Sequence, residues 1–162
     1  MLNGRLPIKN NSYVAKLSFK IIPMKKIAMV SIIDDDAFFQ FSTKKTLELS
    51  NKVEHILQFH DGEEAIQYFL ENKDESDKIP DLVFLDLNMP YMDGWQFLDK
   101  FIVNEFKKEL ITIYICTFST SKFDLDRVSN YPVLKGYLIK PITKVEFFEM
   151  LEKELENDSL LD

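Results

Sequence analysis

The chain has 162 residues, of which 46% are hydrophobic and 29% are charged, a composition typical of one soluble domain with a substantial core. Its single cysteine, Cys116, excludes an intramolecular disulfide, and no apolar run approaches the roughly 18 residues of a membrane span. The formal net charge is −7, which argues against a nucleic-acid-binding surface because phosphate contacts need clustered lysine and arginine. The lone cysteine and the lack of a long apolar run lead us to expect a protein of the reducing cytoplasm.

The N-terminus differs in charge from the rest of the chain. Residues 1–23 contain four basic residues and no acid. They lack the apolar block of a secretory signal, and prolines and asparagines interrupt any helix. We expect a flexible, non-essential extension here, with weak attraction to an anionic surface as the alternative. A single domain is expected at 24–157, followed by a short acidic tail at 158–162.

Short β-rich runs alternate with segments of helical period from residue 25 onward. The expected strands are 26–33, 53–59, 81–86, 110–116 and 136–139, and the expected helices are 36–50, 61–73, about 94–107, about 121–129 and a last helix from 143. The third strand is so continuously apolar that both of its faces should be covered. Five strands interleaved with five helices predict an α/β fold with a doubly wound, five-stranded parallel sheet.

Polar residues lie at the ends of four of the five predicted strands. They are Asp34, Asp35 and Asp36, then Asp86, then Thr117, and finally Lys140. In a parallel sheet the carboxyl ends of the strands meet at one edge, where ligands bind. Carboxylates gathered there would repel one another unless a cation lies between them, and Mg²⁺ prefers such hard oxygen ligands. A lysine and a hydroxyl beside them would suit the oxygens of a phosphoryl group.

The motifs IIDDD, FLDLNMPYMDG, ICTFS and YLIKP occur in this order, each at the end of a predicted strand. In this respect the sequence resembles the receiver domain of two-component response regulators, over about residues 25–155. The resemblance implies the (βα)5 flavodoxin-like fold. It also implies a stand-alone response regulator that receives phosphate from a sensor histidine kinase or a histidine phosphotransfer protein. Since the chain ends soon after its last helix, we expect its output to be contact with a downstream protein target.

The resemblance assigns the acidic residues to phosphoryl transfer. Asp86 would accept the phosphoryl group of a phosphohistidine, forming an acyl phosphate that is later hydrolysed. Asp34, Asp35 and Asp86 would bind Mg²⁺, or Mn²⁺ in its place, together with the backbone carbonyl of Asn88. The protein would thus catalyse only its own phosphorylation and dephosphorylation.

The same resemblance assigns residues to phosphoryl binding and to a switch. Thr117 and Lys140 would hold the phosphoryl oxygens, with a cis peptide bond between Lys140 and Pro141. Thr117 would then move toward the phosphoryl group, and Tyr137 would turn inward. Ser119, in the same hydroxyl-rich stretch, is the alternative to Thr117.

Two further assignments concern the last helix and the first. We expect Val145, Phe148, Leu151 and Leu155 to face the core. Phe147 and Met150 should then lie on a partner-binding face together with Tyr137. Asp36 is expected to cap the helix that follows it, and Cys116 to be a small buried hydrophobe.

Two alternative functions fit part of the pattern. A haloacid-dehalogenase-like phosphatase also uses an aspartate at a strand end with magnesium, but it requires a second aspartate two residues later, where this chain has Asn88. A degenerate receiver-fold module would bind partners without phosphorylation. Such modules tend to lose the acids or the lysine, whereas every position is filled here.

Overall fold

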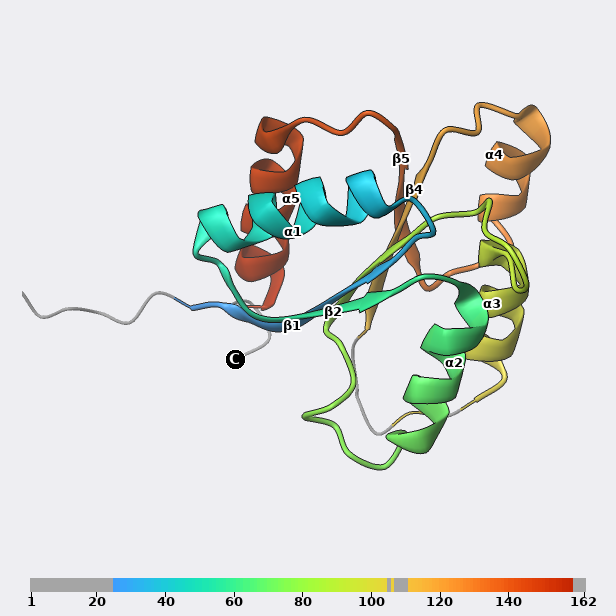
Figure 1. The fold of residues 1–162 in the computed structure, drawn as a ribbon, viewed down its shortest axis with the longest axis horizontal. Coiled ribbons are helices and arrows are strands. Elements are labelled where there is room, and N and C mark those ends of the chain that lie inside the picture. The colour runs from blue at the N-terminus through green and yellow to red at the C-terminus, as the bar shows by residue number, and fades with distance from the viewer. Residues whose placement is uncertain (1–24, 105, 107–110, 159–162) are drawn as a thin grey trace, which may run out of the picture.

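The computed structural model describes residues 25–104, 106 and 111–158. Five strands form one parallel sheet in the order β2-β1-β3-β4-β5, with helices on both faces (Figure 1). The strands are β1 (Ile27–Ile33), β2 (Val53–Phe59), β3 (Leu82–Leu85), β4 (Thr112–Thr117) and β5 (Leu134–Ile139). The helices are α1 (Ala37–Ser50), α2 (Gly62–Glu71), α3 (Gly94–Ile102), α4 (Lys122–Val128) and α5 (Lys144–Asp158). The predicted α/β fold class is confirmed.

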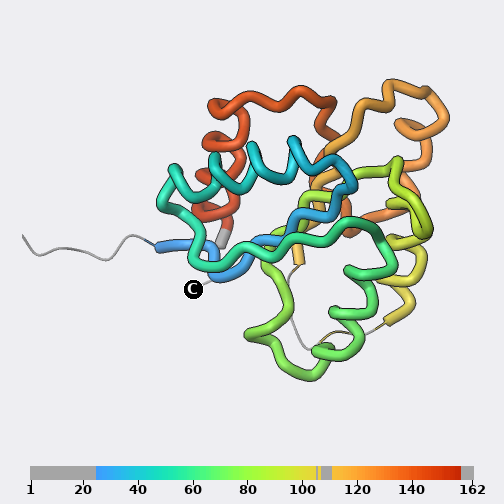
Figure 2. Tube along the Cα trace, viewed as in Figure 1, coloured from blue at the N-terminus to red at the C-terminus, as the bar shows by residue number. Residues whose placement is uncertain are grey.

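The helices divide between the two faces of the sheet. Helices α1 and α5 lie together on one face, whereas α2 and α3 cover the other, with α4 beyond α3 (Figure 2). Strand β3 lies between β1 and β4, and all four of its residues are buried. Val83 and Leu85 belong to the cluster under α2 and α3, and Leu82 and Phe84 to the cluster under α1 and α5. This alternation explains why β3 is continuously apolar.

Aspartates are the N-cap residues of three of the helices. The Asp36 carboxylate accepts hydrogen bonds from the backbone N–H groups of Phe38 and Phe39, at 2.8 and 3.2 Å, as predicted for an N-cap. Asp61 caps α2 in the same way, and Asp93 forms a reciprocal capping box with Gln96 at the start of α3. Each cap fixes the point at which the chain leaves a strand-end loop and enters a helix.

The predicted orientation of the last helix is wrong in part. Phe147 and Met150 are 3% and 6% exposed and pack in the α1–α5 cluster, whereas Val145 is 64% exposed. The Phe147 ring meets Phe84 of β3 edge-on, with 5.3 Å between the ring centroids. Apolar residues surround much of α5, so the sequence left its rotation open, and the contact with β3 sets it. Phe147 and Met150 are therefore core residues and form no exposed partner face, while Leu151 is buried as predicted.

Some predicted segments lie at or beyond the described residues. The predicted extension at 1–23 lies outside them, as does the tail except for residue 158, at which α5 ends. Helix α3 ends at Ile102, several residues earlier than predicted, and β5 begins at Leu134, two residues earlier. Within the described part of the chain, no helix is both long and apolar enough to cross a membrane.

Candidate functional site

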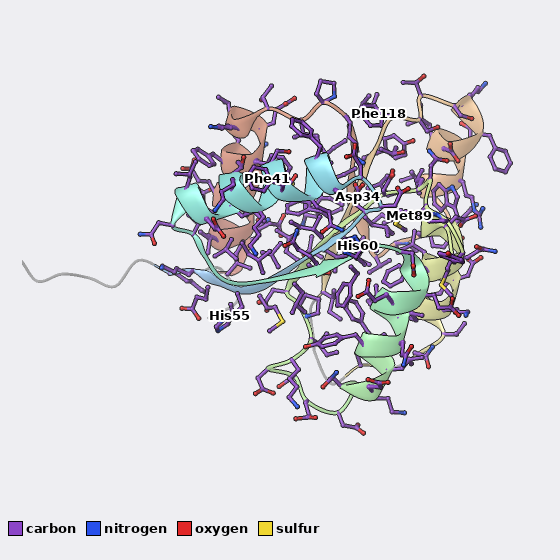
Figure 3. The ribbon with its side chains drawn as sticks, in the orientation of Figure 1. Asp34, Phe41, His55, His60, Met89 and Phe118 are labelled. Atoms are coloured by element: carbon purple, nitrogen blue, oxygen red, sulfur yellow. The ribbon has the colours of Figure 1, made fainter. Side chains whose placement is uncertain are left out.

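The predicted site residues meet at the carboxyl edge of the sheet, where Figure 3 labels Asp34, Met89 and Phe118. The backbone fixes them because hydrogen bonds between strands continue one residue past the strand ends. Asp34 N–H donates to the Phe59 carbonyl at 3.0 Å, and Asp86 N–H to the Ile33 carbonyl at 2.9 Å. Lys140 N–H donates to the Thr117 carbonyl at 2.8 Å. The strands themselves thus align the acids, the hydroxyl and the lysine.

Three carboxylates form a compact cluster at this edge. One carboxylate oxygen each from Asp34, Asp35 and Asp86 lies within 4.8 Å of the others. Asp34 and Asp86 are 1% and 5% exposed, whereas Asp35 is open to solvent. Three negative charges at this separation repel one another, and a hard divalent cation would relieve the repulsion. The set of oxygen donors fits Mg²⁺, and Asp35 is its solvent-exposed member.

Lys140 provides the positive charge at the buried side of this cluster. Its Nζ lies 2.5 Å from Asp34 Oδ2 and 3.5 Å from Asp86 Oδ2. The ammonium also lies 4.1 Å from the ring centroid of Phe39 and 5.3 Å from that of Phe118, within the range of cation–π attraction. A buried lysine needs such partners to remain charged. The sequence did not indicate the two phenylalanines that flank it.

Asp34 experiences opposing influences. Burial raises the pKa of Asp34 to about 6, although the hydrogen bond and charge of Lys140 act to lower it. Its other oxygen accepts a hydrogen bond from the Asp36 N–H at 2.9 Å. A cation beside this carboxylate would favour its charged form.

The loop after β3 holds Asp86 tightly. Asp86 Oδ1 accepts a hydrogen bond from the Leu87 N–H at 2.8 Å, so Oδ2 is the oxygen that faces Lys140. The loop closes where the Gly94 N–H donates to the Leu87 carbonyl at 3.0 Å. A Cβ on Gly94 would collide with the Asp86 carbonyl oxygen. Glycine is therefore required at this position for close approach of the two backbones.

The remaining predicted residues complete the rim of the site. The Thr117 hydroxyl is buried and accepts hydrogen bonds from Asn88 Nδ2 at 3.4 Å and from the Ser119 N–H at 3.3 Å. The Lys140–Pro141 peptide bond is cis, which confirms that prediction. Tyr137 is half-buried, and its hydroxyl donates to the Ser119 carbonyl at 2.9 Å.

Gln40 is a residue of the site that the sequence did not suggest. Its Nε2 donates to the carbonyls of Asp34 at 2.6 Å and Phe59 at 2.8 Å, and the residue is 3% exposed. Gln58 in turn donates to Gln40 Oε1 at 2.8 Å. The one signal in the sequence was its spacing, because Gln40 lies four residues after the cap Asp36, on the face of α1 that contains Thr43 and Leu47.

Cys116, next to Thr117, takes no part in the polar cluster. It is 1% exposed, and burial raises the pKa of its thiol well above the usual value. A buried neutral thiol packs as a small apolar group, as predicted.

Comparison with known proteins identifies the family. Residues 30–152 match the family model of the response regulator receiver domain, and the chain therefore belongs to that family, whose members act in two-component signalling. The site residues found here, from Asp34 to Lys140, lie within the matched range.

Several curated proteins share sequence with this chain. The methanogenesis regulatory protein FilR2 of Methanothrix harundinacea, described as probable, is 28% identical over 129 residues, covering 79% of each chain. The nitrate/nitrite response regulator protein NarL of Escherichia coli is 28% identical over 138 residues, which cover 83% of this chain and 57% of NarL. A protein-glutamate methylesterase/protein-glutamine glutaminase of Geobacter sulfurreducens is 44% identical over 75 residues, or 46% of this chain. The match spans only 18% of that enzyme's length.

Solved structures share the fold. A two-component response regulator from Cytophaga hutchinsonii has a TM-score of 0.71 at 24% identity, covering 82% of this chain and 99% of that one. A CheY-like receiver domain protein from Methanospirillum hungatei has a TM-score of 0.67 at 18% identity, covering 85% and 100%. The flavodoxin-like receiver fold expected from the sequence is thereby confirmed.

Proposed function

We propose that this receiver domain accepts a phosphoryl group from a phosphohistidine on the Asp86 carboxylate. The supporting observation is the cluster itself, in which the acids Asp34, Asp35 and Asp86 lie within 4.8 Å of one another and the Lys140 ammonium contacts the two buried ones. Mg²⁺, or Mn²⁺ in its place, would bind the three carboxylates and the Asn88 carbonyl, and its charge would offset that of the phosphoryl group during transfer.

The residues suggest how the transfer would proceed. Asp86 Oδ2 is our proposed nucleophile, since Oδ1 is occupied by the Leu87 N–H. A bond forms between Oδ2 and phosphorus while the bond from phosphorus to the histidine nitrogen breaks, and the departing imidazole takes a proton from water. Lys140 attracts one phosphoryl oxygen. Positioning and charge therefore do most of the catalysis.

Thr117 would bind a second phosphoryl oxygen. A hydroxyl has one hydrogen to donate and two sites at which to accept. Both accepting sites of Thr117 are used, by Asn88 and by the Ser119 N–H. Its hydrogen thus remains for a phosphoryl oxygen. Ser119, the alternative, donates its own hydroxyl to Asp124 instead, which favours Thr117 for this role.

The proposed output is a protein contact controlled by phosphorylation. The phosphoryl group adds about −1.5 to −2 units of charge. This charge would alter the position of Tyr137, whose hydroxyl is bonded to Ser119. A sensor histidine kinase or histidine phosphotransfer protein would supply the phosphate, and a downstream protein would recognise the changed surface around Tyr137. We also propose that the protein is a single-domain response regulator with its receiver domain at 24–157, and that it acts in the cytoplasm.

The two alternatives receive less support. Position 88, where a haloacid-dehalogenase-like phosphatase would have its second aspartate, is an asparagine whose amide contacts Thr117. A degenerate binding module would not need the acids and Lys140 in mutual contact. We therefore propose no enzymatic activity beyond the domain's own phosphorylation and dephosphorylation.

Intact mass measurement tests the proposal. With Mg²⁺ and acetyl phosphate, the wild-type chain should gain the mass of one phosphoryl group, and Asp86→Asn should gain none. Asp77→Asn, a matched change at an exposed acid of the α2–β3 loop, should behave as wild type. Unmodified wild-type protein, or equal modification of the Asp86 variant, would contradict the assignment.

A further inference from the structure

Helix α4 is held in an unusual way for an element of a packed domain. None of its seven residues, all of which the structure describes, is buried. Helices in proteins usually owe their stability to an apolar face packed on the core. Only Val128, at its end, packs against the core, and that side chain is partly buried. The position of α4 therefore depends largely on a few polar side-chain contacts, which Asp124 and Arg127 make.

Asp124 bridges helix α3 and the loop between β4 and α4. One carboxylate oxygen accepts a hydrogen bond from Trp95 Nε1 at 2.9 Å, and the other accepts from the Ser119 hydroxyl at 2.5 Å. Trp95 is the second residue of α3 and is 6% exposed. Ser119 lies in the loop between β4 and α4. Asp124 thus connects the segment after β3 with the segment after β4.

Ser119 links Asp124 to the phosphoryl site. Its hydroxyl donates to Asp124, its N–H donates to the Thr117 hydroxyl oxygen, and its carbonyl accepts from the Tyr137 hydroxyl. Every polar group of Ser119 is therefore engaged. The residue cannot shift without changing its bonds to both Thr117 and Tyr137.

Trp95 is anchored on the opposite side of the bridge. The Arg127 guanidinium lies 4.7 Å from its ring centroid, and the Tyr131 ring lies 5.3 Å away. The Tyr131 hydroxyl donates to Asp99 at 2.5 Å. Helix α3 follows directly from the loop after Asp86. The hydrogen bond from Trp95 therefore ties Asp124 to the segment that follows the phosphoacceptor.

We infer that Asp124 is a positioning residue of the phosphoryl site, which holds Ser119, and through it Thr117 and Tyr137, in place while fixing α4 to Trp95. This inference rests on the proposed function. Tyr137 is half-buried and its hydroxyl donates to the Ser119 carbonyl, so the bridge holds Tyr137 in this position. We expect the arrangement that the bridge holds to be the one that binds the phosphoryl group. Because coupling between two sites is reciprocal, occupation of the phosphoryl site should also strengthen the attachment of α4 at Trp95.

Trp95 allows a direct test, since it is the only tryptophan of the chain. The full chain with Mg²⁺ would be titrated with beryllium fluoride, a phosphoryl analogue, while tryptophan emission is recorded. Wild-type emission should change saturably. Asp124→Ala should weaken the apparent affinity by about fivefold or more, and should at least halve the emission change. Asp124→Asn keeps an acceptor for Trp95 and should recover part of both effects.

Asp126→Ala is the matched control, because it removes the same charge from an exposed position on the same helix. It should titrate as wild type. Equal titrations for Asp124→Ala and Asp126→Ala would overturn the inference. Ser119→Ala provides a second test, and it should weaken analogue binding as Asp124→Ala does while Trp95 keeps its acceptor. If wild-type protein fails to gain phosphate in the mass measurement, the proposed function itself fails, which is a separate result.

Discussion

The ammonium of Lys140 lies 2.5 Å from Asp34 Oδ2, and both side chains are 1% exposed. A buried ion pair of this kind is costly to break from one side, because the remaining charge loses both its partner and its water. Here two acids share the lysine, since Asp86 also contacts it. The charge balance of the site therefore depends on Lys140.

Lys140→Met tests two roles of the lysine, its effect on the stability of the fold and its effect on phosphoryl transfer. Without the lysine, the two buried carboxylates repel, and we expect a loss of about 3 kcal/mol in the free energy of unfolding. Mg²⁺ should restore more stability to this variant than to wild type, because it no longer competes with an ammonium. Phosphorylation should nevertheless be lost. Urea unfolding with and without Mg²⁺, combined with intact mass, measures both effects; a variant that accepts phosphate as wild type does would contradict the role of Lys140.

Asp35 and Asp36 are neighbours for which we predict opposite effects. Asp35→Asn removes an exposed ligand and should weaken Mg²⁺ binding while changing stability by no more than about 0.5 kcal/mol. Asp36→Ala removes the cap of α1 and should cost about 1 kcal/mol without removing a metal ligand. Calorimetric titration with Mg²⁺ and urea unfolding of both variants test this. The same loss of Mg²⁺ affinity in both would contradict the assignment.

Gln40 should contribute to stability through its amide. Gln40→Leu keeps the approximate size but removes the donor to the Asp34 carbonyl and the acceptor of the Gln58 amide, whereas the Phe59 carbonyl keeps its bond from the Asp34 N–H. A buried polar group left unsatisfied costs about 1–3 kcal/mol. Gln67→Leu, at an exposed position of α2, is the control and should have little effect. Urea unfolding compares the two, and equal stabilities would show that the Gln40 bonds are dispensable.

The rotation of α5 is testable by a pair of truncations. Phe147→Ala removes a buried ring against Phe84 and should destabilise the fold by about 3–5 kcal/mol. Val145→Ala removes an exposed side chain and should change stability by no more than about 0.5 kcal/mol. The reverse order in thermal or urea unfolding would support the rotation expected from the sequence.

The sequence predicted the site better than the surfaces around it. Asp34, Asp86, Thr117 and Lys140 follow apolar strands, and parallel strands bring their carboxyl ends together whatever the details of packing. The rotation of α5 could not be predicted in this way, because it depends on which apolar side chains fit against Phe84. Such a contact joins residues far apart in the chain and leaves no periodic signal.

The same reasoning explains why the polar supports of the site were missed. Gln40 has a role only because the ends of β1 and β2 place two carbonyls beside it. The role that we propose for Asp124 depends on its hydrogen bonds from Trp95 and Ser119, which lie in two other segments. Each is one polar residue among many in the sequence, and the partners become known only with the fold.

Phosphorylation of Asp86 is the most direct test of the proposed function. Wild-type protein incubated with Mg²⁺ and a phosphohistidine donor should gain one phosphoryl group, and peptide mapping should place it on Asp86. Removal of Mg²⁺ by a chelator should abolish the gain, and Asp86→Asn should show none. A wild-type protein that stays unmodified with an active donor, or a phosphoryl group found on another residue, would contradict the proposal.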